Sequence, residues 1–304
     1  MEILRAAAEV IGRVGPAAAD SNVHDRYSAL FLLGRIGRSY PFRRYSRKDL
    51  LDIWGNFKEV YTVWGHRVSP MLRATGELIT HAADVLIGLL GDPDPRVRVG
   101  AAYAVALASR DAVRIIAVVR AWYEVESDPL VQAYLVLAAA QLAIADGDTT
   151  PARAWTENVI RDDRAAPMAR LGAAIAFLCL TDDAPDDGLL TILAETITAE
   201  TTSMLLESPW GATLYEDGLP GWIISLLADD RVAQVNLAMR LLVSPHTTIR
   251  AAACHAVTNL CVTGHSPTPR LAELLVERLR DDDLTVRKLA AGVLARLGPA
   301  AGRT

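Results

Sequence analysis

A repeated turn-and-helix pattern constrains this chain more than any other feature. The stretch GDPDPRVRVGAAYAVALAS, residues 91–109, runs from a turn of Asp and Pro into an alanine-rich helix, and similar stretches begin at positions 126, 164, 244 and 281. We aligned them on the apolar–polar pair that opens each helix, whose second members are Arg98, Gln132, Arg170, Arg250 and Arg287. The spacings are 34, 38, 80 and 37 residues. This period predicts stacked helical repeats, with one degenerate unit between 170 and 250.

The chemistry of the unit explains why two helices are needed in each repeat. Asp or Ser ahead of the helix supplies a side-chain oxygen for the free N–H groups, and Pro fits the first turn. A second helix is expected ahead of each of these helices, in the segments HAADVLIGLLGD, RDAVRIIAVVRAWYEV, PARAWTENVIRDD, GLLTILAETI and PRLAELLVERLRDD. One such pair cannot bury its apolar face alone, whereas a stack of pairs makes a continuous core. The sequence predicts an all-α fold, an α-solenoid of antiparallel helix pairs over 81–304, continuous with a helical cap over 1–80.

The pattern of an Asp-rich turn followed by VR..AA.AL resembles the HEAT repeat, in the short bacterial form also found in phycobilisome-lyase-like proteins. The resemblance covers 81–298, and LLGRIG and VIGRVG nearer the N-terminus look like further repeat ends. It implies a polar ladder in which the turn Asp and the helix Arg of neighbouring repeats pair. The implied ladder residues are Asp94, Arg98, Asp128, Arg170, Arg250, Asp283 and Arg287. Gln132 and Pro167 depart from the pattern, so we expect the ladder to be broken there.

The first irregular segment, 38–70, combines aromatic and basic residues. It holds seven of the 18 aromatic residues of the chain and seven basic residues. Basic residues interleaved with aromatics can bind phosphates and stack on bases, or bind another protein. The candidate binding residues are Arg43, Arg44, Arg47, Lys48, Trp54 and Trp64. The alternatives are a core-facing aromatic stripe on a capping helix and a solvated basic cluster.

The second irregular segment, ESPWGATLYEDGLPGW at 207–222, is expected to be a loop in the degenerate unit. Such a loop can close over a ligand, with tryptophan walls and an acid at its tip. The candidate residues are Trp210, Tyr215, Asp217 and Trp222. The alternative is a long connection whose tryptophans fill the gap left by the irregular repeat.

The positions of each second helix that point away from the predicted core form a row, which in HEAT-like stacks lines the concave face. We call these positions the inner row. They are Val99, Tyr103 and Ala106; Ala133, Leu137 and Ala140; Leu171, Ile175 and Leu178; Ala251, His255 and Thr258; and Lys288, Gly292 and Ala295. Most are small or apolar, which suits an amphipathic helix or a hydrophobic ligand better than a phosphate backbone. Tyr103 and His255 are the candidate binding residues of the row.

The composition of the chain predicts its cellular compartment and the kind of partner it disfavours. Three cysteines lie inside apolar runs, which is typical of buried structural cysteines in a reducing, cytoplasmic compartment. The N-terminus has no basic region ahead of an apolar block, so no signal peptide is expected, and the longest apolar run falls short of a membrane span. Residues 1–75 carry 12 basic and 7 acidic residues, and the remainder carries 19 and 29, so most of the chain is acidic and nucleic acid is a disfavoured partner.

The chain contains no phosphate-binding loop, no HExxH or paired CxxC metal motif and no GxSxG nucleophile elbow. We therefore expect no metal or cofactor, and the leading hypothesis is a non-enzymatic scaffold. It would bind another protein along the concave face or through the N-terminal aromatic and basic segment. Two alternatives stay open. One is an enzyme, lyase-like or DNA-glycosylase-like by analogy of fold alone. The other is a binder of a hydrophobic small molecule that uses the groove and the 207–222 loop.

Overall fold

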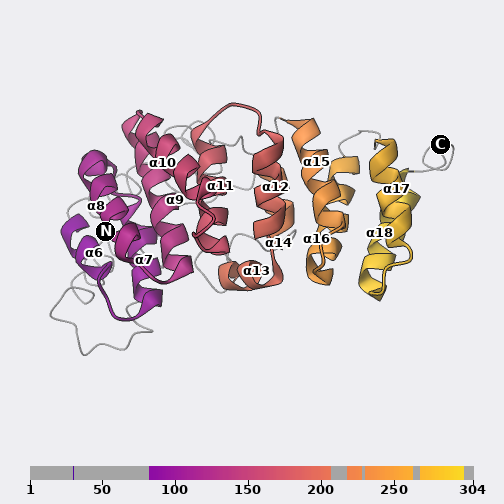
Figure 1. Cartoon of the computed structure of the whole chain (residues 1–304), viewed down its shortest axis with the longest axis horizontal. Helices are drawn as coiled ribbons and strands as arrows, with labels where there is room; N and C mark the ends of the chain where they lie inside the picture. The colour runs from indigo at the N-terminus through magenta and orange to yellow at the C-terminus, as the bar shows by residue number, and fades with distance from the viewer. Residues whose placement is uncertain (1–29, 31–81, 207–217, 228–229, 263–267, 298–304) are drawn as a thin grey trace, which may run out of the picture. The chain divides into compact units, whose positions relative to one another are not determined.

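The computed structural model of the chain describes residue 30 and residues 82–206, 218–227, 230–262 and 268–297. These described residues form thirteen α-helices and one short 3₁₀ helix, with no strand among them, so the fold is all-α as predicted (Figure 1). The helices are α6 (Ala83–Leu89), α7 (Pro95–Val105), α8 (Ala112–Val125), α9 (Pro129–Asp146), α10 (Thr150–Arg161), α11 (Pro167–Leu180), α12 (Asp187–Thr196), α13 (Ala199–Leu206), α14 (Gly218–Leu226), α15 (Arg231–Leu242), α16 (Thr247–Val262), α17 (Pro269–Arg278) and α18 (Leu284–Leu297).

Local capping chemistry sets where the repeated helices begin. The Asp94 carboxylate accepts the N–H of Arg96 at 2.8 Å, ahead of Pro95 in the first turn of α7. Asp128 likewise accepts two N–H groups at the start of α9, which also opens with a proline. These contacts satisfy donors that the helix itself leaves free. The five segments predicted as second helices are helical, as α7, α9, α11, α16 and α18, and so are the five segments predicted as first helices, as α6, α8, α10, α12 and α17.

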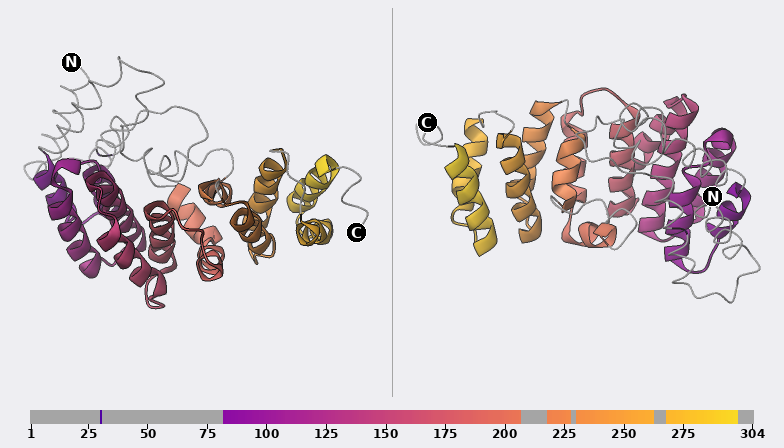
Figure 2. Two further views of the ribbon diagram at one scale, coloured as in Figure 1. Left: turned by 90° about the horizontal axis from the view of Figure 1, so that it is seen from above. Right: turned by 180° about the vertical axis from the view of Figure 1, so that it is seen from behind.

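The structure divides into two compact units, unit 1 over Met1–Asp182 and unit 2 over Asp183–Thr304. The predicted boundary between 80 and 81 lies outside the described residues. In unit 1 the second helices pack in succession, α7 on α9 and α9 on α11, and each is backed by the helix before it, α6, α8 or α10 (Figure 2). Unit 1 therefore consists, over its described residues, of three successive helix pairs.

Helix α9 is the centre of unit 1, in contact with α7, α8, α10 and α11. Its side chains are buried almost all the way round, from Val131 to Ala143 with the single exception of half-buried Gln132. By length and composition alone this 18-residue helix could also cross a membrane. Burial by four neighbouring helices accounts for its apolar character, because a helix that is apolar all round is expected wherever all its faces are covered by protein.

Glycine and alanine allow the second helices to approach one another closely. A Cβ added to Gly172 on α11 would lie 2.7 Å from the Cβ and 2.8 Å from the Cα of Ala133 on α9. A Cβ added to Gly100 on α7 would lie 2.9 Å from the Cβ of Leu30. Leu30 is helical and fully buried, so a residue from the N-terminal part of the chain packs against α7.

In unit 2 the helix pairs are less regular than in unit 1. Helix α16 contacts α14, α15 and α18, while α15 also contacts α12 and α17. Helix α15 was not among the predicted first helices, although Asp230 caps it by accepting the N–H of Ala233. The prediction of a loop over 207–222 is wrong for its second part, because α14 begins at Gly218. Gly218 takes a φ of +63°, and Pro220 lies in the first turn, where its missing N–H costs no helical hydrogen bond.

The cysteines follow the expectation from the sequence in part. Cys179 and Cys254 are buried, while Cys261 is only half-buried, and all three are free thiols. Burial raises the pKa of the Cys254 thiol to about 11, so this group is protonated near neutral pH.

Candidate functional site

Three arginines occupy the same place in the first turn of a second helix. In each, Nη1 donates to the two backbone carbonyls that lie six and five residues earlier. The distances are 2.8 and 3.2 Å for Arg98, 3.0 and 3.0 Å for Arg250, and 2.7 and 3.0 Å for Arg287. The contact closes the turn that leads into the helix, because it satisfies carbonyls that no helix hydrogen bond reaches.

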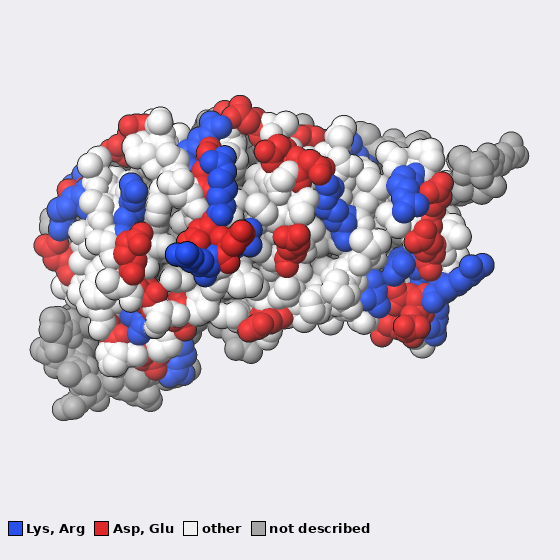
Figure 3. All heavy atoms as spheres, viewed as in Figure 1, with Lys and Arg blue, Asp and Glu red and all other residues white. Residues whose placement is uncertain are grey.

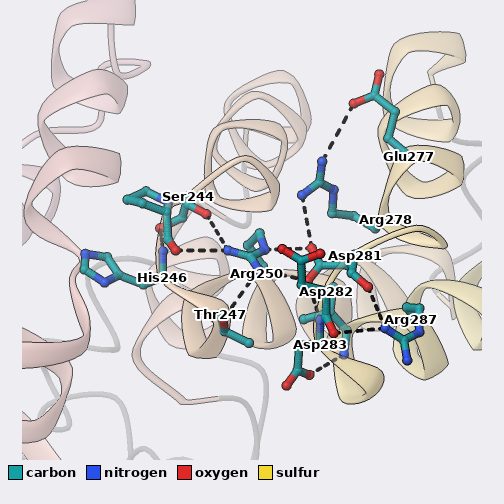
Figure 4. Close-up of polar contacts among 12 residues, drawn as sticks. Ser244, His246, Thr247, Arg250, Glu277, Arg278, Asp281, Asp282, Asp283 and Arg287 are labelled. Carbon is teal, nitrogen blue, oxygen red and sulfur yellow. Dashed lines mark hydrogen bonds and ion pairs between the residues drawn. The ribbon is translucent and has the colours of Figure 1, made fainter.

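Two of these arginines also bind a carboxylate from the next helix pair. Arg98 Nε and Nη2 donate to the two oxygens of Glu126 at 2.7 and 2.9 Å. Arg250 makes the same fork to Asp281, with both distances at 2.8 Å (Figure 4). The acceptors are nearly buried, with side chains 5 % exposed for Glu126 and 1 % for Asp281. Each forked pair is a rung that joins one helix pair to the next.

The rungs correct the predicted ladder. The predicted partners, Asp128 and Asp283, lie two residues after the carboxylates that the arginines bind. Asp128 accepts the N–H groups of Leu130 and Val131, and Asp283 accepts those of Thr285 and Val286. They cap their own helices, as Asp94 does.

The carboxylate two positions before the cap faces back toward the preceding helix pair. It is also held by the N–H of the cap residue itself, at 2.8 Å from Asp128 to Glu126 and at 3.1 Å from Asp283 to Asp281. Asp92 accepts the N–H of Asp94 in the same way. The signal that identifies these residues in the sequence is therefore an acid two positions ahead of the capping Asp.

Charge and hydrogen bonding stabilise the ionised form of both acceptors. The pKa of Asp281 is lowered to about 2 by the hydrogen bonds from Arg250, against the opposing effect of its burial, with further help from the Asp283 N–H and the charge of Arg278. For Glu126 burial acts to raise the pKa, but the Arg98 fork and the N–H groups of Asp128 and Ser127 together lower it. The pKa values of Arg98 and Arg250 are raised by the same hydrogen bonds.

The predicted breaks in the ladder are confirmed. Gln132 stands where arginine is expected and donates only to the backbone carbonyl of Glu126, at 2.9 Å. Arg170 donates to the carbonyl of Ile160, in the last turn of α10, at 3.1 Å, and it lies 3.7 Å from Asp163 in the turn before its own helix. Ala166 precedes this helix and offers no side-chain cap.

The inner row differs between the two units. On α7, α9 and α11 all nine residues are buried, with exposures of 3 % or less. Tyr103 packs beside Tyr134 with ring centroids 6.1 Å apart. The expectation that Tyr103 lies on an open surface is therefore wrong, because the face of α7 on which it lies is covered.

On α16 and α18 the same row is accessible. Ala251, His255 and Thr258 are half-buried on α16, and Lys288, Gly292 and Ala295 are exposed on α18. Because α16 packs against α18, the two stretches belong to neighbouring helices of one unit. A Cβ added to Gly292 would meet no other atom within 4 Å, so this part of α18 faces open space.

Of the other predicted binding residues, only Trp222 lies within the described part of the chain. Trp222 is half-buried in α14 and not in a loop. The remaining candidates lie outside the described residues: Arg43, Arg44, Arg47, Lys48, Trp54, Trp64, Trp210, Tyr215 and Asp217.

Basic and acidic side chains are interspersed on the face seen in Figure 3. Over the part of the chain that the structure describes, no group of three or more His, Cys, Asp or Glu residues is arranged to hold a metal ion. Comparison with known proteins adds no identification: no protein-family model matches the chain, and a search of curated proteins finds no match.

Proposed function

We propose that this protein is a HEAT-type α-solenoid scaffold that binds another protein, and that the partner docks on the inner row of α16 and α18. The solenoid part of the proposal is supported by the rungs Arg98–Glu126 and Arg250–Asp281, because the same side-chain fork joins successive helix pairs in each unit. Such stacks use extended surfaces of side chains to bind partners. A fold alone does not define a function, so the docking part depends on the inner row itself.

The observation that carries the docking proposal is the exposure of the inner row in unit 2. In unit 1 this row is closed, whereas α18 exposes Lys288, Gly292 and Ala295. Small side chains at these positions leave room for the backbone of a partner helix to approach, and amphipathic helices commonly bind in such places. The row on α16 and α18 contains one Lys and no Arg, whereas a surface that tracks a phosphate backbone needs several basic residues.

The proposal is tested with the full-length chain as bait in cells of its native host, followed by quantitative mass spectrometry of the co-purified proteins. Gly292→Arg places a large charged side chain on the inner row, and we expect it to reduce recovery of a specific partner by at least about tenfold. Val276→Arg is the matched control, because it adds the same side chain at an exposed position on α17. We expect this control to retain the partner.

Neither variant should unfold at a lower temperature than the unmodified chain, because neither introduced side chain enters the core. A partner that is lost with Val276→Arg and kept with Gly292→Arg would place docking on α17 and contradict the proposal. Equal recovery with all three baits would contradict it as well.

A further inference from the structure

We propose that a second copy of this chain docks on helix α8, antiparallel to it, so that the protein forms a two-fold symmetric dimer through unit 1. Helix α8 is labelled in Figure 1. The inference goes beyond the proposed function and does not depend on it, because α8 lies in unit 1 and the inner row proposed to bind another protein lies in unit 2. It is carried by the exposed face of α8 and by the order of the side chains along that face.

One side of α8 is exposed although most of its side chains are apolar. The buried side packs on α9 and carries Ala112, Ile115 and Val119, each 2 % exposed or less. Four apolar residues spaced four apart lie on the opposite side, and we call them the outer stripe: Val113, Ala117, Ala121 and Val125. All four are exposed, and the exposed fractions of the two valines are 69 % and 72 %. An apolar stripe on an exposed helix face is typical of a protein-binding surface.

The outer stripe reads the same in both directions about the middle of the helix. Val113 and Val125 lie six positions before and after Val119, and Ala117 and Ala121 lie two positions before and after it. An antiparallel copy of α8 therefore brings valine level with valine and alanine level with alanine. In a two-fold interface each surface must be complementary to itself, because the first residue of a pair meets the second in both directions. The order of the stripe meets this condition.

The charges beside the stripe follow the same symmetry and select the antiparallel arrangement. Arg114 and Glu124 lie five positions before and after Val119, and both are exposed. An antiparallel copy places each Arg114 level with Glu124 of the other copy, whereas a parallel copy in register would place arginine beside arginine and glutamate beside glutamate. Within its own chain Arg114 donates from Nε to Asp111 and from Nη1 to Asp84. Nη2 takes part in neither contact, so these contacts orient the guanidinium without using all its donors.

The sizes of the side chains suit a second helix as the occupant. Ala117 and Ala121 occupy the middle of the stripe, and the distance between two packed helices depends on the side chains at their contact. Alanine at the centre lets the two copies of α8 approach closely, and Val113 and Val125 then cover the contact at both ends. The stripe, its symmetry and its charges therefore point to the same occupant, a second α8.

The dissociation constant of the dimer, measured by sedimentation equilibrium on the purified full-length chain, tests the proposal. Val125→Arg places a charge in the stripe on the same side as Arg114 of the other copy, and we expect it to raise the dissociation constant by at least about tenfold. Val232→Arg is the matched control, because Val232 on α15 in unit 2 is 71 % exposed and Val125 is 72 % exposed. This control should leave the dissociation constant unchanged.

An exchange of charges tests the antiparallel pairing. Glu124→Arg leaves two arginines level with each other, and Arg114→Glu leaves two glutamates level with each other, so each variant alone should dimerise about tenfold more weakly. An equimolar mixture of the two variants should form a heterodimer, because each level then holds one acid and one base. If Arg114→Glu lowers the unfolding temperature through the loss of its contact with Asp84, cross-linking through cysteines decides the question instead.

Disulfide cross-linking reads the register directly. In a background where Cys179, Cys254 and Cys261 are replaced by alanine, a mixture of Val113→Cys and Val125→Cys chains is oxidised with glutathione disulfide. We expect a covalent dimer from the mixture, since positions 113 and 125 of the two copies are level. Val113→Cys alone should stay uncross-linked, because in the antiparallel pair its two thiols are displaced by twelve residues, about 18 Å along the helix axis.

A chain that stays monomeric at every concentration, or a dimer that Val125→Arg leaves as tight as before, would overturn the inference. So would equal weakening by Val125→Arg and Val232→Arg, because the dimer would then not be specific to α8. Efficient cross-linking of Val113→Cys to itself would show a parallel pair and contradict the proposed symmetry. None of these results affects the proposed function, which is tested separately with Gly292→Arg.

Discussion

Arg98 and Glu126 show at the residue scale why the rungs matter for stability. Glu126 is nearly buried, and besides the arginine fork its carboxylate accepts the N–H groups of Ser127 and Asp128. Arg98 is itself only 14 % exposed. A carboxylate that loses such a partner stays desolvated without compensation, which costs much more than the loss of an exposed ion pair.

We therefore expect Arg98→Gln to lower the free energy of unfolding by about 3 kcal/mol, because it leaves Glu126 buried without its counter-charge. Arg96→Gln serves as the control, since Arg96 pairs with Asp94 but is 64 % exposed and should cost less than about 1 kcal/mol. Urea unfolding followed by circular dichroism measures both values. Equal effects of the two substitutions would mean that the rung has no special role in stability.

The same residues show what sequence alone can predict. The capping role of Asp94 and Asp128 follows from chemistry within two or three positions of the helix start, so the helix starts were predicted correctly. Which carboxylate pairs with Arg98 depends on which side of a turn faces the preceding helix pair. Asp128 and Glu126 are two positions apart and both acidic. Only the direction of the backbone at the turn distinguishes the cap from the rung.

At the scale of elements, the approach of one helix to another depends on single missing side chains. Gly172 on α11 lies against the backbone of Ala133 on α9, which cannot move aside as a flexible side chain could. Gly292 lies in the middle of α18 with open space around it. The two glycines occupy helix interiors, so they share the same intrinsic cost to helix formation and differ in their surroundings.

Gly172→Ala should lower the free energy of unfolding by about 1–3 kcal/mol, because the added methyl group would force α9 and α11 apart. Gly292→Ala should instead raise it by up to about 1 kcal/mol, through the better helix propensity of alanine. Thermal or urea unfolding of the two variants provides the comparison. Stabilisation by both substitutions would show that α9 and α11 are not packed as closely as described.

The helices that begin with a capping residue and proline and continue with a regular apolar pattern were predicted, whereas α14 and α15 lack part of that pattern and were missed. Helix α15 has a capping Asp but no proline after it, and its sequence RVAQVNLAMRLL mixes polar and apolar residues, so it did not match the repeat. Helix α14 begins inside a segment whose Gly and Pro content predicted a loop. Pro220 and Gly218 instead mark the start of a helix, because proline is tolerated in a first turn and glycine adopts the positive φ ahead of it.

At the scale of the whole molecule, the two compact units have different inner rows, buried in unit 1 and accessible in unit 2. Leu30 packs against Gly100 on α7, about 70 positions away in the sequence, and no local pattern around either residue predicts that contact. Tyr103 was expected on an open surface and is buried. The row of α16 and α18 keeps the accessibility that the repeat pattern predicted for the whole chain. We therefore propose that a partner binds to unit 2.

Cysteine labelling along the inner row tests this central claim most directly. In a background where Cys179, Cys254 and Cys261 are replaced by alanine, single variants place a thiol in each unit: Ala106→Cys and Ala140→Cys in unit 1, Ala295→Cys and Gly292→Cys in unit 2. Reaction with a maleimide under native conditions, followed by mass spectrometry, gives each rate relative to the unfolded chain. We expect rapid labelling at 292 and 295, and labelling at least about a hundredfold slower at 106 and 140, where exposure is 1 % or less. Equally rapid labelling in both units would contradict the account.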